Sequence, residues 1–382
     1  MNRRKLLKTS ASGLAGLFSA AWLAKTHAAT PVPSGTAISD PCFCSEEALI
    51  RLCCNENPYG PAPSARKAIA DSLHKGNHYP RTFHRKLVSQ IAEYHQLSED
   101  QVLVCSGSAN VLQLIGLYMG QQKKDILSAD NTFQWMMSYA AQFGCQWQKV
   151  PLDEKGYFDL EGLQNALSDQ IGLVYLCNPN NPTGTYLPAE KVHTFCRSVS
   201  QNYPILVDEA YIEYTENGDA DSAARLISEH PNVMVCRTFS KLYGMAGLRV
   251  GYLLAAPEMI KKLAKLEPGY GMNVSNTSLA AASASLADES FRSSSRAKNA
   301  AVRQLTRQKL QEWNVPIFDA SANFIFCDVS HIDTDLKEAF AQENFQLWPF
   351  KISDKTYLRL TIGSQEQMAL FSQKMAPYFL NP

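Results

Sequence analysis

Four short polar segments of this 382-residue chain could do chemistry, and each follows an apolar run. They are Ser106-Gly107-Ser108-Ala109-Asn110, Asn178-Pro179-Asn180-Asn181-Pro182-Thr183-Gly184, Asp208-Glu209-Ala210-Tyr211 and Thr238-Phe239-Ser240-Lys241, with Arg249 eight residues after the last. A lysine amine can bond covalently to an aldehyde, and a Gly-Ser turn that opens a helix can bind phosphate through backbone N–H groups. Each segment alone is common, but their order and spacing together indicate one site.

Pyridoxal phosphate is the cofactor that requires this combination. Its aldehyde forms an imine only with an amine, and Lys241 is predicted to supply it. Its pyridine nitrogen must stay protonated for the ring to act as an electron sink, which requires a buried carboxylate. Asp208 fits, because it follows the apolar run Ile205–Val207. Asn181 and Tyr211 are predicted to donate hydrogen bonds to the ring hydroxyl.

The cofactor phosphate and ring face need further groups. The phosphate requires hydroxyls, helix N-terminal N–H groups and a cation, for which we predict Ser108, Ala109, Ser240 and Arg249. An aromatic side chain should lie on the ring, and Phe133 is predicted, with Trp135 as the alternative.

Alternating strands and helices must position these residues. Near-continuous apolar runs that end in polar or glycine-rich loops are typical of buried parallel strands. The expected strands are Gln101–Cys105, Asp125–Ser128, Gly172–Cys177, Ile205–Val207, Asn232–Cys236 and Arg249–Leu254, with helices at Ser108–Met119 and Trp135–Phe143. This pattern predicts an α/β fold with a large, doubly wound, mainly parallel sheet and ligand loops at the strand carboxyl ends.

The C-terminal part indicates a smaller α+β domain. A long charged helix is expected over Leu286–Trp313, followed by strands at Asn323–Cys327 and Tyr357–Ile362. We therefore predict a signal peptide at 1–28, an N-terminal arm at 29–60, a large cofactor-binding domain at 61–280 and a small domain at 281–382.

Composition excludes several classes of protein. Lys+Arg 36 equals Asp+Glu 36, so no global basic field indicates nucleic acid. A mean hydropathy of −0.22 and a single N-terminal apolar stretch exclude a polytopic membrane protein. The 45% hydrophobic content excludes a disordered chain.

The first 28 residues have the features of a signal peptide. The basic residues Arg3, Arg4, Lys5 and Lys8 precede the weakly apolar run Leu14–Ala24, and cleavage is expected near Ala28. The arginine pair resembles the twin-arginine export signal, which carries folded proteins. An uncleaved anchor is the alternative, but eleven apolar residues are too few to cross about 30 Å of hydrocarbon. We predict a periplasmic or exported protein without a stable membrane span.

The chain resembles the fold-type I pyridoxal-phosphate aminotransferases, and most closely the histidinol-phosphate aminotransferase family. The motifs that carry the resemblance are Arg51–Pro61, Tyr79-Pro80, Thr132-Phe133, Asn180–Gly184, Asp208–Tyr211, Ser240-Lys241, Arg249 and Tyr357–Gly363. The resemblance implies that Lys241, Asp208 and Tyr211 are catalytic, with Lys241 also moving a proton at the substrate Cα. It implies a homodimer in which Tyr79 reaches the cofactor phosphate of the neighbouring subunit. It also implies substrate contacts from Asn57, Tyr59, Asn181, Trp348 and Arg359, with Arg359 binding the substrate's anionic group.

Three segments depart from the family pattern. Asn131 replaces a proline, and Ala109-Asn110 replace an acidic pair, which leaves the backbone donors for phosphate intact. The segment Gln346–Phe350 places Trp348 where relatives carry an arginine that helps bind the phosphate of histidinol phosphate, and Lys351 is the nearest cation. An aromatic pocket does not readily hold a dianion.

We therefore predict an aminotransferase that moves an amino group between an aromatic L-amino acid and a 2-oxo acid such as 2-oxoglutarate. Histidinol-phosphate transamination and a related decarboxylation of an amino acid are the alternatives. A non-catalytic binding protein is the third, although it would not need Lys241.

The ten cysteines and the clustered histidines carry weaker signals. Four cysteines lie in strand-like runs and are expected to be buried as small hydrophobes: Cys105, Cys177, Cys236 and Cys327. Pairing between Cys42-Phe43-Cys44 and Cys53-Cys54 stays open. Although His74, His78 and His84 are loosely spaced like metal ligands, no carboxylate or cysteine completes a shell, and no metal site is predicted.

Overall fold

The computed structural model describes residues 49–267, 269 and 272–380. The twin-arginine motif, the cleavage site near Ala28, and Cys42 and Cys44 lie outside these residues. The predictions made for them stay predictions.

A seven-stranded sheet forms the first layer, in the spatial order β2-β8-β7-β6-β5-β3-β4. Its strands are β2 (Val102–Cys105), β3 (Asp125–Ala129), β4 (Trp147–Val150), β5 (Ile171–Cys177), β6 (Ile205–Asp208), β7 (Val233–Thr238) and β8 (Gly251–Leu254). Neighbouring strands are parallel from β7 through β6, β5 and β3 to β4. The predicted α/β fold with a large, mainly parallel sheet is confirmed.

The expectation of a parallel strand over Arg249–Leu254 was wrong, because β8 runs antiparallel to both β2 and β7. Gly251 lies opposite Thr238, so the chain turns back through the intervening loop instead of crossing over the sheet through a helix. The loop that holds Lys241 therefore starts and ends on adjacent strands.

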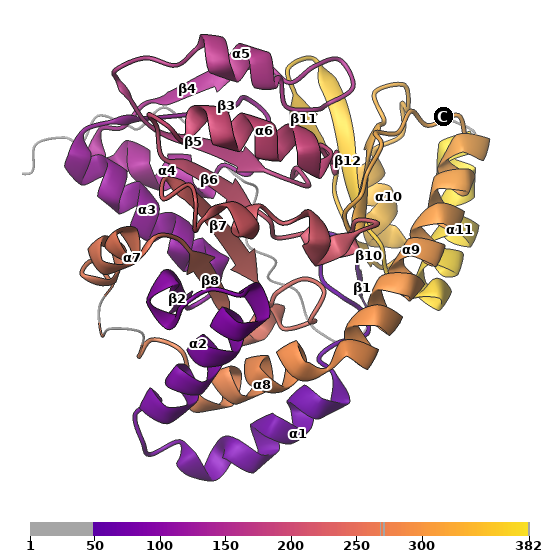
Figure 1. Ribbon diagram of the computed structural model, residues 1–382. Coiled ribbons are helices and arrows are strands. Elements are labelled where there is room, and N and C mark those ends of the chain that lie inside the picture. The colour runs from indigo at the N-terminus through magenta and orange to yellow at the C-terminus, as the bar shows by residue number, and fades with distance from the viewer. Residues whose placement is uncertain (1–48, 268, 270–271, 381–382) are drawn as a thin grey trace, which may run out of the picture. The chain divides into compact units, whose positions relative to one another are not determined.

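Helices cover the sheet and build a flank beside it (Figure 1). They are α1 (Pro63–Ser72), α2 (Arg81–His95), α3 (Ser108–Gln122), α4 (Trp135–Ala140), α5 (Leu160–Asn165), α6 (Ala189–Val199), α7 (Pro257–Ala264) and α8 (Asn276–Ala287). Short 3-10 turns occur at Leu73–Lys75, Glu99–Gln101, Ala141–Phe143, Ile212–Tyr214, Gly218–Asp221, Ala223–Leu226 and Ala246–Leu248. Helix α6 shows why these segments are helical, since its buried Val192, Phe195, Cys196 and Val199 recur at helical spacing.

The long charged helix expected near Leu286–Trp313 is confirmed, although it starts three residues later. Helix α8 ends at Ala287, and a separate helix, α9 (Glu289–Glu312), follows it. The Asp288 carboxylate accepts a hydrogen bond from the backbone N–H of Phe291 (2.9 Å), which caps α9. The charge pattern of α9 was visible in the sequence, but the apolar α8 before it was not expected.

The C-terminal elements form a second layer around a smaller sheet. It contains β9 (Phe324–Asp328), β11 (Phe350–Ile352) and β12 (Lys355–Thr361) in the antiparallel order β11-β12-β9. The strand β1 (Ile50–Arg51) pairs in parallel with β10 (Phe345–Gln346). The helices α10 (Leu336–Gln342) and α11 (Gln365–Leu380) complete this part, and Figure 1 shows α9 running alongside α11.

Two buried apolar clusters correspond to these layers. The larger surrounds the seven-stranded sheet, and the smaller joins Leu52 to residues of α9, α10, α11 and the small sheet. Helix α9 contributes to both, because Phe291 packs on the larger cluster whereas Val302 and Leu310 belong to the smaller. The domain limits at residues 28, 60 and 280 stay predictions. In the part of the chain described here, no helix is long and apolar enough to cross a membrane.

Candidate active site

Four predicted side chains meet where β6, the loop after β5, the loop after β7 and β12 converge. Asn181 Nδ2 donates a hydrogen bond to the Tyr211 hydroxyl (3.4 Å), and Arg359 Nη1 donates to Asn181 Oδ1 (2.7 Å). Lys241 Nζ lies 5.6 Å from the centroid of the Tyr211 ring. The sequence separates these residues by up to 178 positions, and the two sheets bring them together.

Asp208, the last residue of β6, is 2% exposed. The Tyr175 hydroxyl donates to its Oδ2 (3.0 Å), and the backbone N–H of Ala210 donates to its Oδ1 (3.1 Å). Burial raises the pKa of Asp208 to about 6, and these two hydrogen bonds oppose the rise. Its charged form would be favoured by a cation such as a protonated pyridine nitrogen.

Lys241 has the electrostatics of a reactive amine. Burial lowers its pKa to about 8, with a smaller contribution from the neighbouring guanidinium of Arg359. Its Nζ donates a hydrogen bond to the carbonyl oxygen of Cys54 (3.1 Å). Because the pKa lies close to neutral, part of the Lys241 population is an uncharged amine, which can act as a nucleophile or a base.

Arg359 lies on β12 and is half-buried. Its Nη2 donates to the carbonyl oxygen of Cys53 (2.9 Å), and its guanidinium carbon lies 5.8 Å from the centroid of the Phe324 ring. Its buried Nε has no hydrogen-bond partner among the described residues. A guanidinium with an unused N–H is suited to a carboxylate or a phosphate.

A second group of predicted residues gathers at the N-terminus of α3. Arg249 Nη1 donates to the Ser240 hydroxyl (3.3 Å), which also accepts a hydrogen bond from Thr238 Oγ1 (3.0 Å). Gly107 precedes the helix at φ +81°, and a Cβ there would lie 2.4 Å from Arg249 Nη2. The absence of this side chain allows the guanidinium to lie against the turn.

The helix end itself has the character of a phosphate site. Ser108 and Ala109 open α3, whose first N–H groups have no intrahelical partner and whose first turn holds no acidic residue. The Asn110 Oδ1 is buried without a hydrogen-bond partner within the described residues. Together with Asp208 and Lys241, this helix end fits pyridoxal phosphate, since it supplies anion donors at one end and an amine and a carboxylate at the other.

Asn55 is a site residue that the sequence analysis missed. Its Nδ2 donates to the Tyr211 hydroxyl (3.0 Å), its backbone N–H donates to Thr361 Oγ1 (2.9 Å), and its φ is +54°. Burial raises the pKa of Tyr211, and its hydroxyl accepts from two amides. The signal available was the pair of asparagines in Asn55-Glu56-Asn57, of which only Asn57 was chosen.

The Asn57 side chain makes hydrogen bonds to three other parts of the protein. Its Nδ2 donates to the carbonyl oxygen of Leu242 (2.6 Å) and to Ser295 Oγ (2.7 Å), while its Oδ1 accepts from the backbone N–H of Tyr59 (3.0 Å). It thereby ties its own loop to the Lys241 loop and to α9. Gly60 and Gly244 strengthen this junction, because a Cβ on Gly60 would lie 2.5 Å from the Gly244 Cα.

The surroundings of the other predicted residues are described by their exposure and their ring contacts. Tyr79 is 79% exposed, and the Tyr59 ring lies 5.0 Å from Lys298 Nζ. Trp348 is half-buried in the segment between β10 and β11. Phe133 is half-buried against the larger core, whereas Trp135, the alternative ring-stacking residue, is 40% exposed. Over the described residues, no group of three or more His, Cys, Asp or Glu side chains could hold a metal ion.

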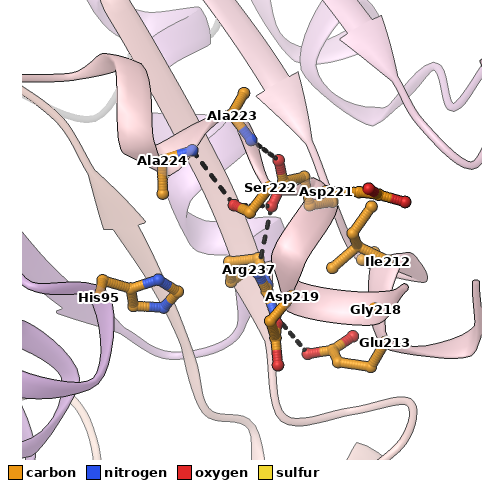
Figure 2. A network of polar contacts seen from close by, with 12 residues as sticks. His95, Ile212, Glu213, Gly218, Asp219, Asp221, Ser222, Ala223, Ala224 and Arg237 are labelled. Atoms are coloured by element: carbon orange, nitrogen blue, oxygen red, sulfur yellow. Dashed lines mark hydrogen bonds and ion pairs between the residues drawn. The ribbon is translucent and has the colours of Figure 1, made fainter. Parts of the chain in front are cut away.

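A second buried polar group, here called the Arg237 cluster, adjoins the same strands and consists of Arg237, Glu209, Glu213 and Asp219. Arg237 is fully buried and donates to Glu209 Oε2 (3.1 Å), to Glu213 Oε1 (2.9 Å) and to Asp219. Figure 2 shows Asp219 and Glu213 beside Arg237, and His95, the last residue of α2, on another side. The sequence analysis gave these residues no role.

Three comparisons with known proteins bear on the site. The family model described as aminotransferase class I and II matches residues 47–374. A histidinol-phosphate aminotransferase of Halalkalibacterium halodurans is 32% identical over 326 residues, which cover 84% of this chain and 86% of the relative. One from Staphylococcus carnosus is 34% identical over 323 residues, covering 84% and 88%. The solved structure of histidinol-phosphate aminotransferase from Sinorhizobium meliloti in complex with pyridoxal-5'-phosphate is 25% identical, with a TM-score of 0.78 and coverage of 87% of this chain and 91% of that one.

Proposed function

This chain belongs to the class I and II aminotransferase family and is an aminotransferase dependent on pyridoxal phosphate. We propose that it transfers the amino group of histidinol phosphate to a 2-oxo acid such as 2-oxoglutarate. The observation that carries the proposal is Arg359, which lies beside Asn181 with an unused N–H among the described residues. The phosphate of histidinol phosphate would bind to this guanidinium. Relatives at 32% and 34% identity carry the name of that activity.

The residues divide the work of the reaction. Pyridoxal phosphate, when bound, supplies an aldehyde and an electron-withdrawing ring that stabilises negative charge at the substrate Cα. Asp208 would keep the pyridine nitrogen protonated, and Asn181 and Tyr211 would hold the ring hydroxyl. Lys241 would hold the cofactor through its amine and would move the proton at Cα, for which its pKa of about 8 is suited. The N-terminus of α3, Ser240 and Arg249 hold the phosphate.

An aromatic L-amino acid is the second candidate donor, because the small sheet carries aromatic residues next to Arg359. Phe326 pairs across the sheet with Arg359. Its ring stacks on Tyr357 with centroids 4.9 Å apart and lies 5.7 Å from Phe350. Trp348 lies two residues before Phe350, so aromatic residues continue into the segment between β10 and β11. An aromatic pair would add about 0.5–1.5 kcal/mol beyond simple burial.

A donor screen tests the two candidates. With 2-oxoglutarate as acceptor, kcat/KM is measured for histidinol phosphate, phenylalanine, tyrosine and histidine. A higher value for histidinol phosphate supports the proposal, and a higher value for phenylalanine or tyrosine favours the aromatic donor. Trp348→Arg should raise the ratio of histidinol phosphate to phenylalanine, while Phe143→Arg, at a side chain that is 44% exposed, is the matched control. An amine product without a keto acid would instead indicate decarboxylation.

We propose further that the enzyme is a homodimer and that Tyr79 acts in the neighbouring subunit. The exposure of this tyrosine supports the proposal, since a partner could cover it. The test mixes Lys241→Ala subunits with Tyr79→Ala subunits under conditions that allow exchange. If Tyr79 acts across the interface, the mixed dimer contains one intact site and recovers activity, whereas no recovery indicates action within its own subunit.

Export through the twin-arginine route is the last part of the proposal, and it rests on Arg3-Arg4 and the apolar run behind them. A double variant, Arg3→Lys with Arg4→Lys, should keep the protein in the cytoplasm, because that route reads the arginine pair. Unimpaired arrival in the periplasm would contradict it. Replacing Lys5 and Lys8 with arginine is the control that leaves the pair intact.

A further inference from the structure

The Tyr211 hydroxyl lies between two amide groups that can only donate to it. Asn55 Nδ2 lies 3.0 Å from the hydroxyl oxygen, and Asn181 Nδ2 lies 3.4 Å from it. An amide NH2 group donates and does not accept, so the Tyr211 oxygen accepts from both. Among the described residues, no acceptor contacts the hydroxyl's own hydrogen. The Tyr211 O–H is therefore available to donate to a group that enters the site.

The orientation of each amide is fixed by a neighbouring donor that cannot accept. Arg359 Nη1 donates to Asn181 Oδ1 (2.7 Å), so Asn181 turns its Nδ2 toward Tyr211. The backbone N–H of Asn55 donates to Thr361 Oγ1 (2.9 Å), and the Thr361 hydroxyl donates its single hydrogen to Asn55 Oδ1 (3.1 Å). Because Oδ1 is engaged there, the Nδ2 of Asn55 is directed at Tyr211.

The backbone and the ring around this contact are also held. The Asn55 carbonyl oxygen accepts a hydrogen bond from Asn323 Nδ2 (2.9 Å), and the φ of Asn55 is +54°, a left-handed conformation in which asparagine is enriched. The Tyr211 ring packs edge to face against Phe324, with centroids 5.2 Å apart. Burial raises the pKa of Tyr211, so the hydroxyl keeps its hydrogen at neutral pH. The direction of that hydrogen is the freedom that remains.

We propose that Thr361 and Asn55 are positioning residues, which direct the Tyr211 hydrogen at the ring hydroxyl oxygen of pyridoxal phosphate. Thr361 keeps the Asn55 amide in one orientation, and that amide donates to the Tyr211 oxygen. If the Thr361 hydroxyl is removed, the amide can turn over, and its oxygen then accepts the Tyr211 hydrogen in competition with the cofactor. The proposal rests on the role proposed for Tyr211 and not on the choice of amino donor.

A pH titration of the absorbance of the bound cofactor tests the proposal in the holoenzyme. A hydrogen bond donated to the ring oxygen reduces its ability to hold a proton, so loss of the bond should move the titration to higher pH. We expect Tyr211→Phe to raise the equilibrium constant for proton binding about tenfold, as for a lost hydrogen bond to a charged group. Thr361→Val should raise it about threefold, because the Asn55 amide then samples both orientations.

Control variants separate this role from a general effect on the fold. Thr361→Ser keeps the hydroxyl and should titrate as the parent does, as should Thr356→Val on the same strand, β12. Tyr211→Phe combined with Thr361→Val should give the constant of Tyr211→Phe alone, because Thr361 acts only through the Tyr211 hydroxyl. A further increase in the double variant, or a Thr361→Val protein that titrates as the parent, would overturn the proposal.

Asn55→Asp carries the test if Thr361→Val does not fold, because the valine also removes the acceptor of the Asn55 backbone N–H. Aspartate has nearly the same shape, but its carboxylate only accepts hydrogen bonds. It should therefore take the Tyr211 hydrogen and raise the constant for proton binding about tenfold. Most of this increase should disappear in the background of Tyr211→Phe, and an equal increase there would contradict the proposal.

The outcomes distinguish this inference from the functions on which it rests. If Tyr211→Phe titrates as the parent, Tyr211 does not donate to the ring oxygen, and the proposal fails with that premise. A change in Tyr211→Phe without one in Thr361→Val overturns the positioning role alone. Absent turnover of histidinol phosphate would contradict the donor proposal and leave these titrations unchanged, because they are recorded without an amino donor.

Discussion

Two buried polar groups, the active site and the Arg237 cluster, lie on opposite sides of the same strand ends. The consecutive residues Asp208 and Glu209 belong one to each group. Asp208 contacts Tyr175 on the active-site side, whereas Glu209 accepts hydrogen bonds from Ser222 Oγ (2.6 Å) and the Ala223 backbone N–H (2.7 Å) on the side of the Arg237 cluster. Successive side chains of a strand point to opposite faces, so the Asp-Glu pair serves both sides at once. The two groups differ in how their charges are balanced.

In the Arg237 cluster, the charged side chains pair with one another. Burial pushes the pKa of Asp219 up, but Arg237 and Tyr94 outweigh it and leave the pKa at about 2. Burial raises the pKa of Glu213 to about 7 despite Arg237. Arg237 therefore has three carboxylate partners, all of which belong to the protein itself (Figure 2).

In the active site, the cationic side chains outnumber the buried carboxylates. Three cations, Lys241, Arg249 and Arg359, occur with one fully buried carboxylate, Asp208. The cations are held mostly by hydroxyl, amide and carbonyl oxygens and have little opposite charge near them. Such a site suits a cofactor and substrates that bring phosphate or carboxylate groups. The comparison implies that substitutions on one side should affect catalysis and those on the other side should affect stability.

Lys241→Ala is expected to have the largest effect, on the catalytic side alone. The variant lacks the amine that binds the cofactor and moves the proton, so turnover and the absorbance of the covalently bound cofactor should be lost together. The melting temperature of the apoprotein should stay within a few degrees of that of the parent. Lys261→Ala, at an exposed position of α7, is the control. Normal transamination by Lys241→Ala would refute the assignment.

Arg237→Met should show the opposite behaviour. Removing a fully buried cation leaves three carboxylates without their partner, which should lower the free energy of unfolding by about 3–5 kcal/mol. Denaturant titration measures this loss, and the kcat/KM of the folded fraction should change less than threefold. Arg225→Met, at an exposed arginine nearby, should have little effect on either quantity. A stable Arg237→Met protein with impaired catalysis would break the division between the two sides.

The adjacent variants Asp208→Asn and Glu209→Gln give a matched test at one strand end. Asp208→Asn keeps the shape but removes the charge, and we expect a loss of about 2–4 kcal/mol of transition-state stabilisation, measured as kcat/KM. Glu209→Gln should instead lower the melting temperature and leave kcat/KM within threefold. An Asp208→Asn enzyme within threefold of the parent would mean that another group holds the pyridine proton.

The sequence predicts the residues of the active site but not those of the Arg237 cluster. The sequence predicts Lys241, Asp208, Asn181 and Arg359 from their chemistry and their strand-end positions. In the structure Arg359 donates a hydrogen bond to Asn181, and the charge of Lys241 acts on Asp208. The carbonyls of Cys53 and Cys54 were missed, because a backbone contact does not depend on the residue type that carries it. The hydrogen bond that ties Asn57 to α9 depends on Ser295, which is 238 positions away and cannot be inferred from a local motif.

Sequence patterns could not predict the Arg237 cluster or the direction of β8, for other reasons. Hydrophobic periodicity gives the existence of a buried strand but not its direction. An arginine in the apolar run Val233–Thr238 has no local sign of being buried, because its partners Glu213 and Asp219 lie in separate 3-10 turns. A cluster of charged residues that pair with one another can be identified only when the fold is known.

The smallest effect is expected at His95, at the edge of the Arg237 cluster. Its Nε2 lies 3.0 Å from the Tyr252 hydroxyl, and its ring contacts that of Tyr94. Burial, assisted by the charge of Arg237, lowers the pKa of His95 to about 3, whereas its ordinary value is 6.5. The unfolded chain therefore binds a proton that the folded protein does not bind, and stability is lost as the pH falls from 6.5 toward 3.

His95→Gln keeps a polar group for Tyr252 but cannot be protonated. The difference in unfolding free energy between pH 7 and pH 5 should shrink by about 1 kcal/mol, a value discounted because His95 is only partly enclosed. Urea titrations at the two pH values measure it, with His331→Gln on the exposed surface as control. If His95→Gln lost as much stability as the parent on acidification, the acid sensitivity would have to come from other groups, and His95 would not belong to the charge balance of the Arg237 cluster.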